Sequence, residues 1–136
     1  MNGRCRIGLC RIRSVVFGVW MCTKKLLHFE SIRLFCGPSA LLYEPIKEKV
    51  VALHQQGYVH GDLRDTNLMV RKNGAPEMML FDFDWAGEIG KVRYPINVNR
   101  GPNLTRPDGA YDGELITVEH DVEMLDIMFK AALSST

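Results

Sequence analysis

A short run of acidic and amide side chains in this sequence suits phosphoryl transfer. The letters His-Gly-Asp-Leu-Arg-Asp-Thr-Asn occupy His60–Asn67, and Asp-Phe-Asp follows at Asp82–Asp84. An Asp can orient an attacking hydroxyl and take its proton. An Asn five positions later on the same loop can reach Mg²⁺, and a second Asp after a strand can hold the metal that bridges the phosphates of ATP. The spacing therefore makes Asp62, Asn67 and Asp82 candidates for these three roles.

The segments around this run predict elements that would hold it in place. Residues 44–56 show a helical pattern, with Pro45 in the first turn and Gly57 in the left-handed position after the helix. Residues 58–60 are typical of a short strand. Residues 68–70 and 78–81 are typical of two more strands, joined at the Asn73-Gly74 turn. The candidate residues would then lie in loops that flank a small β-hairpin.

Two further segments complete the expected organisation. Residues 84–116 are rich in Gly, Pro, Asn and Asp and lack periodicity, which predicts a long irregular segment of the kind that often carries function. A second helix is expected to begin near Thr117, a good N-cap, with acidic residues in its first turn. Its apolar stripe, predicted to face the core, comprises Val118, Val122, Leu125, Phe129 and Ala132.

Charge divides the chain near Gly37. Residues 1–36 contain seven basic groups and one acid, a balance of +6, whereas residues 37–136 contain ten basic and fifteen acidic groups, a balance of −5. All four cysteines also lie before Gly37, at spacings that match no metal or disulfide framework, so free thiols in a reducing compartment are expected. We therefore predict a basic, cysteine-containing segment over 1–36 and a folded domain over 37–136.

The origin of residues 1–36 stays open at this point. The arginines from Arg4 to Arg13 precede a short apolar run at 15–22, as in a signal or transit peptide, but Lys24 and Lys25 stand where a cleavage site should be. The apolar run is too short to cross a bilayer. We expect a cytoplasmic protein without a transmembrane segment, whose first residues are either an address or a misjoined start that replaced an upstream domain. The basic residues are not interleaved with aromatic residues as in nucleic-acid-binding proteins, so we expect no nucleic-acid partner.

The motifs resemble those of the protein-kinase-like superfamily. His60–Asn67 is similar to its catalytic loop and Asp82–Asp84 to its metal-binding Asp-Phe-Gly element. Together with "YPINVNR" and "GELITVEHDVEML", these motifs resemble fungal-type protein-kinase-like domains over roughly residues 38–130. The resemblance implies an α+β fold of the C-lobe kind, mainly helical, with a small β-hairpin that bears the catalytic and metal loops.

The resemblance also implies roles for individual residues. Asp62 matches the catalytic Asp, Asn67 the metal-binding Asn that also braces the loop, and Asp82 the Asp that chelates Mg²⁺ against the ATP phosphates. Arg64 stands where protein kinases usually carry a Lys that faces the γ-phosphate, and it keeps the positive charge with a larger planar head. ATP and Mg²⁺ are thus the implied cofactors, and a protein Ser or Thr hydroxyl is the implied acceptor.

The same resemblance implies structural roles for two further residues, and the sequence departs from the family pattern at two others. His60 matches a His that packs beneath the metal element, and Asp121 matches a helix Asp that clamps the catalytic-loop backbone. Gly61 replaces the Arg that usually receives an activation-loop phosphate, and Asp84 replaces a Gly. His-Gly-Asp also occurs in aminoglycoside- and choline-kinase-like enzymes, which keeps a small-molecule acceptor open.

The sequence contains no glycine-rich phosphate loop and no paired Lys and Glu upstream of Asp62. We therefore expect a C-lobe fragment whose N-lobe is absent from this chain, with little activity alone, because phosphoryl transfer depends on positioning by a complete cradle. The alternative is a non-catalytic remnant that binds a partner protein, or the missing lobe, through exposed apolar surface.

Overall fold

The computed structural model describes residues 29–31, 40–71 and 78–133. In chain order the elements are β1 (Phe29–Ser31), α3 (Ala40–Gln55), β2 (Tyr58–Val59), the 3-10 turn η2 (Asp65–Asn67), β3 (Leu68–Arg71), β4 (Met78–Leu80), β5 (Gly87–Glu88) and α4 (Val118–Leu133). Within these described ranges, two helices with small antiparallel sheets make an α+β fold, as expected at that level. The cysteines and the Asn73-Gly74 turn lie outside the described residues.

Helix α3 forms because Ile46, Val50 and Leu53 recur at helical spacing, and all three side chains are fully buried. The helix ends at Gln55, and Gly57 follows with φ of +86°, a left-handed conformation that favours glycine. The Gly57 N–H donates to the His54 carbonyl at 2.9 Å and satisfies one of the last helical acceptors. The predicted C-terminal cap of this helix is therefore confirmed.

The predicted start of α3 is wrong by about one turn. The helix begins at Ala40, so Pro45 lies inside it rather than in its first turn. A proline there cannot donate to the Leu41 carbonyl. Leu42 and Tyr43 pack against the core and offset that loss, while the Leu41 side chain is 86% exposed on a turn that faces solvent.

The main sheet has the strand order β1-β3-β4, with both pairings antiparallel. In the predicted hairpin, Leu68 lies opposite Leu80 and Val70 opposite Met78, and all four side chains are buried. Met69 and Met79, opposite each other and pointing to the other face, are only partly buried. The third strand, β1, was not predicted, because three residues carry too little pattern to identify a strand.

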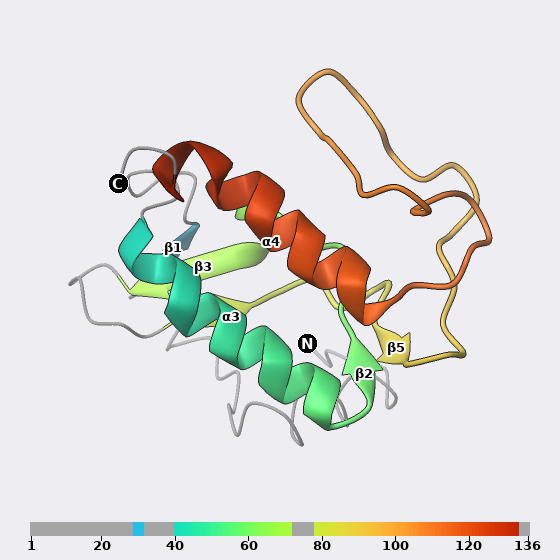
Figure 1. Cartoon of the computed structure of the whole chain (residues 1–136), viewed down its shortest axis with the longest axis horizontal. Helices are drawn as coiled ribbons and strands as arrows, with labels where there is room; N and C mark the ends of the chain where they lie inside the picture. Colours follow the sequence, from blue (N-terminus) through green and yellow to red (C-terminus); the bar gives the residue numbers. More distant parts are fainter. Residues whose placement is uncertain (1–28, 32–39, 72–77, 134–136) are drawn as a thin grey trace, which may run out of the picture.

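The two helices lie side by side and antiparallel, in front of the sheet (Figure 1). The end of α3 meets the start of α4 through His54 and Asp121, and the start of α3 meets the middle of α4 where the Tyr43 hydroxyl donates to Asp126. Leu125 and Phe129 of the predicted apolar stripe are buried in the core between these layers. The larger apolar cluster contains Ile46, Val50, Leu53, Leu63, Leu68, Val70, Met78, Leu80, Phe83, Met124, Leu125 and Phe129.

The irregular segment, predicted over residues 84–116, spans residues 89–117 and runs from β5 to the start of α4 (Figure 1). Strand β5 falls inside the predicted bounds and was not expected. Its base is tied down by the β2–β5 pairing and by a bridge between Arg93 and Leu115. It has its own apolar cluster, made by Val59, Tyr94, Val98, Ala110 and Ile116. The segment is therefore packed onto the body of the protein. None of the helices in the described ranges is long and apolar enough to cross a membrane.

Candidate functional site

The predicted catalytic loop, His60–Asn67, leaves β2 and enters β3 through η2. Gly61 has φ of +83°, and a Cβ built on it would come within 2.8 Å of Ile116 Cδ1 and 3.3 Å of Trp85 Cβ. Both the backbone conformation and the space exclude a side chain there. The Gly that replaces an Arg of the kinase pattern is thus required by close packing of the irregular segment on the loop.

Asp121 clamps the loop from the first turn of α4. Its two oxygens accept the backbone N–H groups of His60 at 2.8 Å and Gly61 at 2.9 Å, and the carboxylate is 1% exposed. His54 Nε2, at the end of α3, lies 2.9 Å from the same carboxylate. The predicted contact between Asp121 and the loop backbone is confirmed. The sequence did not predict that His54 also contacts the Asp121 carboxylate. α4 can place Asp121 here because Thr117 caps the helix, accepting the His120 N–H at 3.3 Å.

His60 holds the loop against the segment that follows β4. Its Nδ1 accepts the Asp62 N–H at 3.2 Å, which leaves Nε2 to donate to the Phe81 carbonyl at 2.8 Å. Its ring lies 4.8 Å from the Phe83 ring. Burial lowers the pKa of His60, so the ring is neutral near pH 7 and has a structural role, as predicted.

Asp62 and Asn67 lie close together, as the spacing predicted. Asn67 Nδ2 donates to the Asp62 carbonyl at 2.8 Å and to Asp62 Oδ2 at 3.2 Å, and both residues are buried. These bonds brace the loop and fix the direction of the Asp62 carboxylate. They also orient Asn67, because its amide nitrogen is committed to Asp62 while its Oδ1 accepts from the Thr66 hydroxyl at 3.4 Å.

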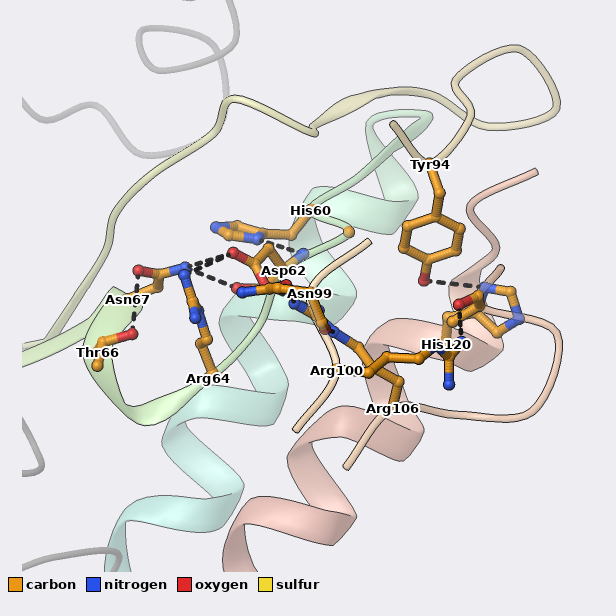
Figure 2. A network of polar contacts seen from close by, with 12 residues as sticks. His60, Asp62, Arg64, Thr66, Asn67, Tyr94, Asn99, Arg100, Arg106 and His120 are labelled. Carbon is orange, nitrogen blue, oxygen red and sulfur yellow. Dashed lines mark hydrogen bonds and ion pairs between the residues drawn. The ribbon is translucent and has the colours of Figure 1, made fainter. Parts of the chain in front are cut away.

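Two guanidinium groups flank Asp62 (Figure 2). Arg64 Nη2 lies 3.2 Å from Asp62 Oδ2, and Arg106 Nη1 lies 2.8 Å from Oδ1. Arg106 comes from the irregular segment and its side chain is only 1% exposed. In this structure Arg64 is therefore an ion-pair partner of Asp62. Arg106 was missed entirely, since nothing in its sequence neighbourhood distinguishes it from a surface arginine.

Asp82 occupies the bend that follows β4. Its φ of +55° is unusual for a residue other than glycine, and its side chain is exposed. The adjacent Phe81 N–H donates to the Asn67 carbonyl at 2.8 Å, so a backbone hydrogen bond joins the Asp82 segment directly to the His60–Asn67 loop. Asp84 is exposed as well. The fold thus brings Asn67 and Asp82 onto neighbouring loops.

The donor set is compatible with Mg²⁺ in kind. A carboxylate and an amide oxygen are hard ligands, and Mg²⁺ is commonly held by one or two carboxylates together with waters and substrate phosphates. Among the described residues no three His, Cys, Asp or Glu side chains gather into a closed metal cage. Such a site would therefore rely on phosphate oxygens to complete its coordination.

A pocket of about 220 Å³ adjoins the loop on the Arg64 side. Its lining includes Leu63, Arg64 and Asp65 of the loop, Thr105 of the irregular segment and Met128 of α4. The pocket gives a small polar group room to approach the arginine from solvent. Comparison with known proteins adds no assignment, because no protein-family model and no curated protein matches the sequence.

Proposed function

We propose that this chain is the C-lobe part of an ATP- and Mg²⁺-dependent phosphotransferase of the protein-kinase-like superfamily, acting on a protein Ser or Thr hydroxyl. The observation that carries the proposal is that hydrogen bonds hold both the backbone of the His60–Asn67 loop and the Asp62 carboxylate on it. Asp121 fixes the backbone of the loop, and Asn67 fixes Asp62 within it. An ordinary surface loop does not need a buried carboxylate held at both its backbone and its side chain.

Each residue has a chemical task in this proposal. Asp62 orients the acceptor hydroxyl and takes its proton. Asn67 and Asp82 hold Mg²⁺, which supplies charge neutralisation on the ATP phosphates. Arg64, on the wall of the pocket, faces the transferring group. In this proposal the described residues supply the acceptor side and the metal side of the reaction.

Calorimetric titration of Mg²⁺·ATP into the purified chain tests the metal half of the proposal. We expect saturable, Mg²⁺-dependent binding that Asp82→Asn abolishes. The matched control is Asp84→Asn, which removes the same charge from an exposed residue two positions away and should retain binding. Equal loss in both variants would reduce the effect to general charge. Absence of binding by a chain with native circular dichroism would contradict the proposal.

A non-catalytic binding module is the second candidate. The observation in its favour is exposed apolar surface: Leu41 on α3 is 86% exposed and Ile96 in the irregular segment is 73% exposed. In this reading the loop network is retained for stability alone. Asp82→Asn would then leave every binding property of the chain unchanged.

A further inference from the structure

The Asp62 carboxylate is closed off from solvent in this structure. Asn67 and Arg64 contact Oδ2, Arg106 contacts Oδ1, and the residue is only 4% exposed. A general base must come within hydrogen-bond reach of the hydroxyl it deprotonates. Because Arg106 covers the oxygen that Asn67 and Arg64 leave open, an acceptor reaches Asp62 only after the Arg106 guanidinium has moved.

Arg106 is held by more than its ion pair. Its Nη2 donates to Asn99 Oδ1 at 2.5 Å, its Nε donates to the Asn99 carbonyl at 3.3 Å, and its Cζ lies 4.9 Å from the centre of the Trp85 ring. These three contacts all come from residues outside the catalytic loop. They can keep the guanidinium near the site after it leaves Asp62, so the side chain can change partner without leaving its place in the fold.

The charges at this point favour an anion. Arg64 and Arg106 both contact the Asp62 carboxylate, and Asp65 is the other acidic residue that lines the pocket beside Arg64. A buried guanidinium that loses its carboxylate is strongly disfavoured unless another anion replaces it. A tetrahedral oxyanion fits this need, since its oxygens can accept from two guanidinium groups at once.

We propose that Arg106 is a positioning residue that closes the site by pairing with Asp62 and opens it by passing its guanidinium to an oxyanion of the phosphoryl class. The oxyanion breaks the Arg106–Asp62 pair and leaves Oδ1 free for the acceptor hydroxyl. This inference rests on the proposed role of Asp62, but the exchange of partners is a property of the described residues and needs neither ATP nor Mg²⁺.

Nuclear magnetic resonance of the full chain tests the exchange, with sulfate as the probe and chloride at matched ionic strength as the reference. We expect sulfate to shift the Arg106 Nε–H signal and the Asp62 carboxyl carbon along one saturation curve, because binding separates the pair. Asp62→Asn removes the competing carboxylate and should tighten sulfate binding at Arg106 by at least about tenfold. The Arg100 signal, from an exposed guanidinium over the Tyr111 ring, serves as the internal reference.

Two further variants make the test specific. Asp84→Asn changes net charge equally without touching Arg106, so it should leave the sulfate affinity unchanged. Arg106→Lys keeps the charge but loses the planar head that bonds Asn99 and stacks on Trp85, so the Asp62 signal should no longer respond to sulfate. The proposal is overturned if sulfate leaves Arg106 unshifted, if Asp84→Asn tightens binding as much as Asp62→Asn, or if Asp62 responds equally in Arg106→Lys. Because no nucleotide is present, this result is independent of the Mg²⁺·ATP titration.

Discussion

Replacing Asp121 by Ala should destabilise the protein more than any other single change at the start of α4. The substitution removes a carboxylate that accepts the His60 and Gly61 N–H groups at 2.8 and 2.9 Å, with His54 Nε2 at 2.9 Å as a third contact. Hydrogen bonds to a charged group contribute about 1.5–3 kcal/mol each, and both backbone donors would be left buried and unpaired. The expected loss in free energy of unfolding is therefore about 3–6 kcal/mol, a large part of the roughly 5–15 kcal/mol of a typical domain.

Urea unfolding followed by circular dichroism measures this loss. The matched control is Glu123→Ala, an exposed acid on the same helix, which should change stability by less than about 0.5 kcal/mol. Asp121→Asn should fall between the two, because its amide oxygen can still accept from one N–H while its amide nitrogen faces the other donor. A loss below about 1 kcal/mol for Asp121→Ala would show that the clamp does not hold the loop, and the reasoning about the site would fail with it.

Two other changes test the packing around the loop. Gly61→Ala should lower the free energy of unfolding by about 2–4 kcal/mol, because the alanine would be left-handed and its Cβ would lie 2.8 Å from Ile116. Gly57 has a similar φ but open space around it, so Gly57→Ala should lower the free energy of unfolding by only about 1 kcal/mol. Equal losses in urea unfolding would contradict the steric argument. Burial raises the pKa of Tyr94 from 10.0 to about 12, so its contribution to stability is fully present below pH 10 and is lost as the pH rises toward 12. Between pH 9 and pH 11.5 the unfolding midpoint should therefore fall less in the Tyr94→Phe variant than in the unchanged protein. An equal fall of the midpoint in both proteins would refute the assignment.

Local patterns were sufficient for the elements around the site. Helical spacing of Ile46, Val50 and Leu53 predicted α3, and Gly57 correctly predicted its end. Two short apolar runs on either side of Asn73-Gly74 predicted β3, β4 and their pairing. These features depend on periodicity and on the steric freedom of glycine, both of which are properties of a few neighbouring residues. The start of α3 was missed because packing of Leu42 and Tyr43 on the core, and not local preference, extends the helix past Pro45.

What the sequence determined by itself is the set of candidate groups: the spacing of Asp62, Asn67 and Asp82, and the helix-borne Asp121. Their candidate roles follow from residue type and from spacing along the chain. Only the tertiary structure decided that Arg106 closes over Asp62, that His54 joins the Asp121 clamp and that Ile116 leaves no room for a side chain at Gly61. Each of these contacts joins residues more than 40 positions apart. Such contacts depend on how whole elements pack, so no local pattern in the sequence encodes them.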